Sequence, residues 1–111
     1  MNLETIKETF MIAFNYPHIK KVGVFGSYAR EEQHSRSDLD ILLEYDDSSD
    51  EFMDDLGGFM EDIEKTISCD IDYVTLNGLI RGKDTNFKEQ VLKEVKWLYI
   101  ANPKERDTKN V

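Results

Sequence analysis

The fold of this 111-residue chain is decided by GSYAREEQHSRSDLD, residues 26–40, which separates two apolar runs. The first run ends at a Gly-Ser pair, and the second begins directly after an Asp-Leu-Asp triplet. Glycine lets the backbone turn sharply and approach a bulky anion. A serine at a strand-to-helix junction presents its hydroxyl beside the free N–H groups of the helix start, which suit phosphate. Gly26 and Ser27 are therefore predicted to form a phosphate-binding turn.

Two pairs of aspartates share one spacing. Asp38 and Asp40 are two residues apart on a predicted strand, so both side chains leave the same face. Such a pair suits Mg²⁺, which combines carboxylates with substrate phosphates. Asp70 and Asp72 repeat the spacing; we interpret Asp72 as a third carboxylate that holds metal and accepts a proton from an attacking hydroxyl. Asp70 lies nearer the strand start and is interpreted as its cap. The combination predicts phosphoryl or nucleotidyl transfer.

Hydrophobic periodicity predicts helices and strands in alternation. Strands are expected at residues 19–25, 37–45 and 69–75, with a short strand over 97–100, and helices at residues 2–15, 27–33, 52–67 and 87–98. Local signals add three details: Ser27 as an N-cap, Ser48 and Glu51 as a capping box, and a turn at Asn77-Gly78.

The phosphate turn and the first aspartate pair also constrain the strand directions. The turn follows the strand over 19–25, whereas the pair begins the strand over 37–45, so they share one sheet edge only if these strands are antiparallel. The helix after residue 51 permits a right-handed parallel crossover to the strand over 69–75. We therefore expect a small mixed sheet flanked by helices, of the α/β class, in one domain over residues 1–101, followed by a polar, flexible tail over 102–111.

Composition restricts the partners. The formal charge is 14 − 23 = −9, which argues against a nucleic-acid groove and suits a small molecule or a basic protein. The single Cys69 cannot form an internal disulfide, which favours the cytoplasm. Glu4 and Glu8 interrupt any signal-peptide pattern, and no apolar run approaches the length of a membrane span.

Several residues near the central stretch keep more than one interpretation. Gly26 and Ser27 could be an ordinary strand–helix turn. Arg30 either neutralises phosphate charge or pairs with an acid. Ser37 borders the aspartate pair and completes the predicted nucleotide-binding set of Gly26, Ser27, Arg30 and Ser37. The acidic residues between 46 and 55 lack an EF-hand pattern and indicate a solvated helix start or a partner surface.

The motif as a whole resembles that of a known superfamily. Gly26-Ser27, ten residues and then Asp38-Leu-Asp40 resemble the signature of the polymerase-β-like nucleotidyltransferases, and GSYAR followed by SDLDIL is similar to their minimal nucleotidyltransferase (MNT) branch. Asp72 falls where that family places its third carboxylate. The resemblance covers roughly residues 20–100. It implies a mixed-sheet nucleotidyltransferase fold, ATP as donor, and two Mg²⁺ ions held by Asp38, Asp40 and Asp72.

The resemblance also implies a partner. Many small members resemble antitoxins paired with a helical HEPN toxin, an RNase whose tyrosine they adenylylate. The implied function is transfer of AMP to such a hydroxyl. The family usually continues GSxARG, whereas Glu31 stands here in place of the last glycine. An extra acid near the phosphate site would weaken nucleotide binding, which leaves two alternatives: an antitoxin that acts by docking, and a transferase that modifies small molecules such as antibiotics.

Overall fold

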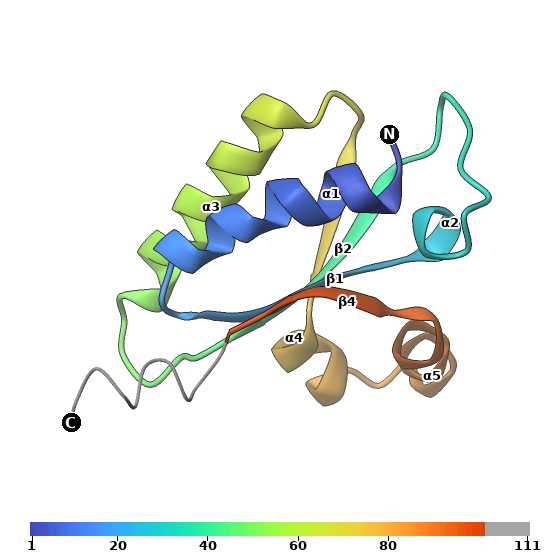
Figure 1. Cartoon of the computed structure of the whole chain (residues 1–111). Helices are drawn as coiled ribbons and strands as arrows, with labels where there is room; N and C mark the ends of the chain where they lie inside the picture. The colour runs from blue at the N-terminus through green and yellow to red at the C-terminus, as the bar shows by residue number, and fades with distance from the viewer. Residues whose placement is uncertain (102–111) are drawn as a thin grey trace.

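The computed structural model describes residues 1–101, which form a four-stranded mixed sheet with helices on both faces (Figure 1). The strands are β1 (Ile19–Phe25), β2 (Leu39–Tyr45), β3 (Ile71–Thr75) and β4 (Lys96–Ile100), in the order β3-β2-β1-β4. β1 is antiparallel to β2 and β4, and β2 is parallel to β3. The predicted α/β class and both predicted strand directions are therefore confirmed. The tail expected over 102–111 lies outside the described residues.

The helices divide between the two faces of the sheet. α1 (Leu3–Phe10), which continues into the 3₁₀ turn η1 (Met11–Asn15), and α3 (Phe52–Thr66) cover one face. α4 (Leu76–Arg81) and α5 (Thr85–Glu94) cover the other, and the short α2 (Gly26–Ala29) follows β1 at one end of the sheet (Figure 1). In the part of the chain that the structure describes, no helix combines the length and apolar character needed to cross a membrane.

The alternation of side chains along β2 decides which face carries the site. Leu39, Ile41 and Leu43 are fully buried in the larger core beneath α1 and α3. Leu42 is buried in the smaller core with Val91 of α5. Because successive strand residues point to opposite faces, Asp40 lies on the α5 side of the sheet with Leu42. The site is therefore built on the face of the sheet that carries the smaller core.

The start of α2 differs from the expectation. α2 begins at Gly26, Phe25 is its N-cap residue, and no side chain caps it, so the predicted Ser27 N-cap is wrong. The helix ends at Ala29 instead of Gln33 because Glu31 has a φ of 56°, in the left-handed region where a helix cannot continue.

Two further cap and turn predictions are wrong. α3 starts after Glu51 without a side-chain cap, and the N–H of Ser48 donates to Asp46 Oδ1 at 2.9 Å, so Ser48 and Glu51 form no capping box. Residues 77 and 78 lie inside α4 instead of forming a turn. The Thr75 hydroxyl caps that helix by accepting a hydrogen bond from the Gly78 N–H at 3.0 Å.

The last helix is shorter than its apolar pattern suggests. α5 begins after Asp84, whose side chain accepts a hydrogen bond from the Phe87 N–H at 3.0 Å, and it ends at Glu94. Val95 lies beyond the helix, and Leu98 belongs to β4, the short strand expected near residues 97–100. The apolar residues at helical spacing therefore continue across the junction between α5 and β4. Because α5 ends at Glu94, the Glu94 carboxylate lies beside the start of α2.

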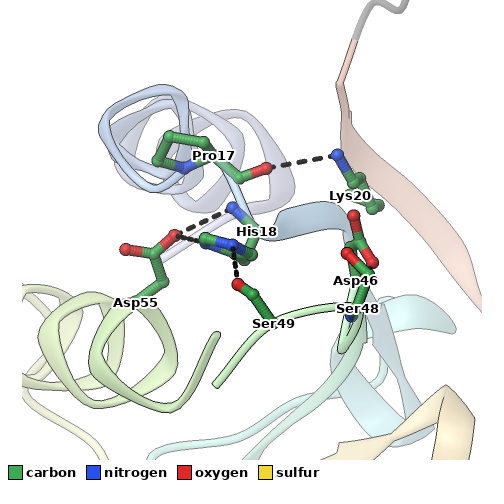
Figure 2. A network of polar contacts seen from close by, with 7 residues as sticks. All are labelled: Pro17, His18, Lys20, Asp46, Ser48, Ser49 and Asp55. Atoms are coloured by element: carbon green, nitrogen blue, oxygen red, sulfur yellow. Dashed lines mark hydrogen bonds and ion pairs between the residues drawn. The ribbon is translucent and has the colours of Figure 1, made fainter. Parts of the chain in front are cut away.

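At the opposite end of β1, polar contacts connect the sheet to α3 (Figure 2). The backbone N–H of His18 donates to Asp55 Oδ2 at 2.8 Å, and His18 Nδ1 lies 2.7 Å from the same oxygen. His18 Nε2 lies 3.2 Å from Ser49 Oγ. Part of the acidic stretch over 46–55 is thus used to fasten the loop before α3, while most of its side chains are exposed.

Candidate functional site

Strand register collects the predicted carboxylates in one place. Phe25 of β1 pairs with Asp40 of β2, and Asp40 pairs with Asp72 of β3, so one row of the sheet carries both aspartates. Asp38 precedes Asp40 on the same face, and Gly26 follows Phe25. These residues surround a cavity of about 630 Å³ whose lining is Phe25, Gly26, Ser27, Arg30, Asp38, Asp40, Asp72, Val74, Phe87, Gln90, Val91 and Glu94.

The phosphate turn requires glycine at position 26. Gly26 has a φ of 71°, a conformation that L side chains rarely adopt. A Cβ atom there would overlap Asp40 Oδ2 and would lie 3.3 Å from Asp40 Cγ. The close approach brings the Gly26 backbone against the carboxylate row, so an anion bound at the turn would lie next to a cation bound by the aspartates.

Asp40 is the electrostatic centre of the row. Partial burial raises the pKa of Asp40, and the charges of Asp72 and Asp38 raise it further, while Arg30 opposes the shift. Among residues 1–101, no three His, Cys, Asp or Glu side chains already lie together as a ready metal site. The charges of Asp72 and Asp38, which raise the pKa of Asp40, show that the three carboxylates repel one another. Oxygen ligands that repel one another suit a hard divalent cation, and Mg²⁺ takes further ligands from phosphate and water.

Arg30 enters the cavity already paired. Its Nε lies 2.6 Å from Glu32 Oε1, and its Nη1 lies 2.9 Å from Glu94 Oε1. The pairing of Arg30 with acids is therefore observed, and Arg30 also lines the cavity; neutralisation of phosphate charge by Arg30 stays a prediction.

Glu94 was not found by the sequence analysis. Its Oε2 accepts a hydrogen bond from the Gly26 N–H at 3.2 Å, and its Oε1 accepts from Arg30 and, at 3.3 Å, from Gln90 Nε2. Burial alone would raise the pKa of Glu94, but the hydrogen bonds from Gln90 and Gly26, together with the charge of Arg30, hold that pKa below its usual range. Glu94 is therefore a carboxylate at the predicted phosphate turn.

Three residues that the sequence placed at or near the site, Ser37, Asp70 and Glu31, lie outside the cavity. Ser37 Oγ accepts a hydrogen bond from the His34 N–H at 2.9 Å, which shapes the loop before β2, and nucleotide binding by Ser37 stays a prediction. The Asp70 carbonyl accepts from the Leu39 N–H at 2.8 Å, and Asp70 lines a neighbouring groove. Glu31 is exposed and does not line the cavity.

α5 supplies an aromatic wall that was also missed. Phe87 lies with its ring centroid 6.3 Å from that of Phe25, at an interplanar angle of 77°. Phe87, Gln90 and Glu94 recur at helical spacing, which would have shown that they share one face of a helix. That spacing gives no indication that the face turns toward Gly26, which is 68 residues away from Glu94 in the chain.

Comparisons with known proteins point to one family. Residues 4–104 match the family model described as "Polymerase beta, Nucleotidyltransferase". A relative from Methanocaldococcus jannaschii, named "Putative protein adenylyltransferase MJ0435", is 32% identical over 79 residues, which cover 71% of this chain and 83% of the relative.

Solved structures share the fold. One described as a "putative minimal nucleotidyltransferase" has a TM-score of 0.64 and 29% identity, covering 86% of this chain and 95% of that chain. A chain of a toxin-antitoxin crystal structure with AMP-PNP has a TM-score of 0.60 and 24% identity, covering 94% and 79%. A chain of the complex between a tri-AMPylated Shewanella oneidensis HEPN toxin and an MNT antitoxin has a TM-score of 0.53 and 21% identity, covering 94% and 78%.

Proposed function

The chain belongs to the polymerase beta nucleotidyltransferase family, and from this premise we propose that it is an Mg²⁺-dependent adenylyltransferase that transfers AMP from ATP to a hydroxyl group of a partner protein. The observation that carries the proposal is one cavity lined by Asp38, Asp40 and Asp72 together with the Gly26 turn. The name of the M. jannaschii relative, a protein adenylyltransferase, supports the same reaction class.

The proposed reaction divides the cavity lining into two sets. Gly26, Ser27 and Arg30 hold the β- and γ-phosphates, while Asp38, Asp40 and Asp72 hold two Mg²⁺ ions. When bound, Mg²⁺ supplies neutralisation of the charge on the phosphate oxygens. The acceptor oxygen forms a bond to the α-phosphorus, the bond between that phosphorus and the bridging oxygen to the β-phosphate breaks, and pyrophosphate leaves. Asp72 takes the proton from the acceptor hydroxyl.

For the acceptor, we propose a tyrosine hydroxyl of a HEPN-family toxin, which makes this chain an antitoxin. The structural relatives support this choice, because they include an AMPylated HEPN toxin bound to its MNT antitoxin. Charge supports it as well. A chain with a formal charge of −9 attracts a basic surface and speeds the encounter with it, and an RNA-cleaving protein needs such a surface.

The test is to mix the purified protein, ATP and Mg²⁺ with the small helical protein encoded by an adjacent gene, and to weigh the intact partner by mass spectrometry. We expect the partner to gain one or more AMP units, and the Asp38→Asn/Asp40→Asn double variant to add none. A matched double variant on exposed positions outside both the cavity and the acidic stretch over 46–55, Glu4→Gln/Glu8→Gln, should retain transfer.

Other outcomes would replace the proposal. A tight complex without a mass change, formed equally by the Asp38→Asn/Asp40→Asn variant, would show an antitoxin that acts by docking. If the partner is neither bound nor modified, the acceptor is of another class, and a small-molecule hydroxyl becomes the next candidate.

A further inference from the structure

Glu94 contacts two of the three residues that the proposed reaction assigns to phosphate, Gly26 and Arg30. Its carboxylate accepts the Gly26 N–H at 3.2 Å and lies 2.9 Å from Arg30 Nη1. Gln90, one turn earlier on α5, donates to the same carboxylate at 3.3 Å. With three donors and a side chain that is 19% exposed, Glu94 fills the place where a phosphate oxygen would bind.

The cavity lining carries more negative than positive charge. Arg30 is the single Lys or Arg among the described residues that line it, whereas the lining carboxylates are Asp38, Asp40, Asp72 and Glu94. A triphosphate adds several negative charges. A carboxylate and a phosphate cannot both accept the same Gly26 N–H, and like charges brought together at the same donors repel each other. Triphosphate binding at the turn therefore requires Glu94 to leave.

From this geometry we propose that Glu94 is a built-in competitor for the phosphate subsite, which sets the affinity for nucleoside triphosphates. Its carboxylate accepts hydrogen bonds from the Gly26 N–H and from Arg30 until the β- and γ-phosphates replace it. The inference rests on the proposed function. It also assigns selectivity: a ligand whose phosphate chain reaches Gly26 must displace Glu94, whereas AMP, whose only phosphate belongs beside the aspartates, need not.

The position of Glu94 on its helix favours reversible displacement. Glu94 is the last residue of α5, where the helix dipole presents its negative end and disfavours a carboxylate. Its contacts with Gly26, Arg30 and Gln90 hold the side chain in the cavity in spite of that field. When phosphate binds Gly26 and Arg30, the Glu94 side chain can turn toward solvent.

The experiment measures binding of ATP with Mg²⁺, of inorganic tripolyphosphate and of AMP by calorimetry. The variants are Glu94→Gln, which removes the charge, and Glu94→Ala, which removes the occupant. Because a competitor lowers the apparent affinity to the fraction of sites that it leaves free, both variants should bind ATP and tripolyphosphate roughly tenfold more tightly, with the affinity for AMP changed much less. Glu89→Gln, on an exposed position of the same helix, is the control and should change none of the three affinities.

Each contrary result has a distinct meaning. If the wild type binds ATP and the Glu94 variants bind ATP and tripolyphosphate equally or more weakly, the competitor proposal is wrong, while the proposed function stands. Weaker binding would indicate that Glu94 orients Arg30 for the phosphates. If folded wild type and variants all fail to bind ATP and tripolyphosphate, both the proposed function and this inference are wrong. An equal gain for AMP would also overturn the proposal, because it would indicate a general charge effect.

Discussion

The carboxylates near the two ends of β1 differ in their surroundings: hydrogen-bond donors surround those at one end, and other carboxylates surround Asp40 at the other end. At the start of the strand, Asp55 accepts two contacts from His18, and Asp62 accepts a hydrogen bond from the Tyr16 hydroxyl, which raises the pKa of Tyr16 to about 12. At the far end, Asp40 is raised in pKa by burial and by its neighbours Asp72 and Asp38. Hydrogen-bonded carboxylates connect the sheet to α3 at one end, whereas the aspartates at the other end repel one another and are available for a ligand.

The largest expected effect separates two aspartates at the site end. Asp72 lines the cavity opposite Asp40, whereas Asp70, two residues earlier, lies outside it. Asp72→Asn should lower the transfer of labelled AMP roughly 100-fold or more, because a metal ligand and proton acceptor is lost. Asp70→Asn, the matched control, should lower it only slightly. Equal losses in both variants would mean that the whole start of β3 matters, and the distinction by cavity lining would be wrong.

How much the sequence could reveal about this end depends on the range of the contacts. The Gly-Ser pair ends β1, and the Asp-Leu-Asp triplet begins the adjacent antiparallel strand β2, so strand direction alone brings the two together. The parallel direction of β3 brings Asp72 to the same edge. Glu94 meets Gly26 across 68 residues, through the packing of α5, and no local pattern encodes that approach.

Local signals were misread where two of them competed. Residues 77 and 78 indicate a turn by composition, yet Thr75 caps them into α4, and a Thr before that segment was a visible N-cap signal. Ser27 is a good N-cap residue by type, but the left-handed Gly26 already begins α2. A neighbouring residue decided the outcome in both places: Thr75 through its side-chain cap, and Gly26 through its backbone conformation.

The second prediction tests the paired end. Asp55→Ala removes the acceptor of the His18 N–H and the neighbour of His18 Nδ1, with both side chains 19% exposed. Leaving these partly buried donors unpaired should lower the free energy of unfolding by about 1–2 kcal/mol, measured by urea denaturation. Asp54→Ala, on an exposed position one residue earlier, should change stability much less. ATP affinity should be the same in both variants, and a loss in Asp55→Ala alone would show that the two ends are coupled.

At the site end of β1, a substitution is expected to raise the free energy of unfolding, by less than Asp55→Ala lowers it. Because the folded-state pKa of Asp40 is raised, the folded protein binds the Asp40 proton more tightly than the unfolded chain does, and ionisation costs stability as pH rises through the carboxyl range. Asp40→Asn should therefore raise the free energy of unfolding near pH 7 by about 0.5–1 kcal/mol. The gain should shrink as pH falls through the carboxyl range, because the wild-type carboxyl then takes up its proton. If Asp40→Asn instead lowers the free energy of unfolding at neutral pH, the Asp40 carboxylate stabilises the fold, and the interpretation that it is available for a ligand is wrong.

The smallest effect concerns backbone strain next to the site. Within the described residues, Glu31 is the one non-glycine residue with a positive φ, 56°, and it stands where the resembled family usually has glycine. The left-handed conformation costs a non-glycine residue about 1–2 kcal/mol, and the greater freedom of glycine in the unfolded chain offsets part of that gain. Glu31→Gly should therefore raise the free energy of unfolding by about 0.5 kcal/mol in urea denaturation.

Glu31→Gly also tests why the resembled family usually has glycine at the position of Glu31. Because the Glu31 side chain is exposed and does not line the cavity, Glu31→Gly should leave ATP affinity unchanged, so the glycine serves the backbone and not the nucleotide. Ser35→Gly, in the same loop and without a positive φ, is the control and should lower stability, since there the added freedom of glycine relieves no strain. If Glu31→Gly tightens ATP binding while stability stays the same, the acid acts on the phosphate site by charge, and the backbone explanation is wrong.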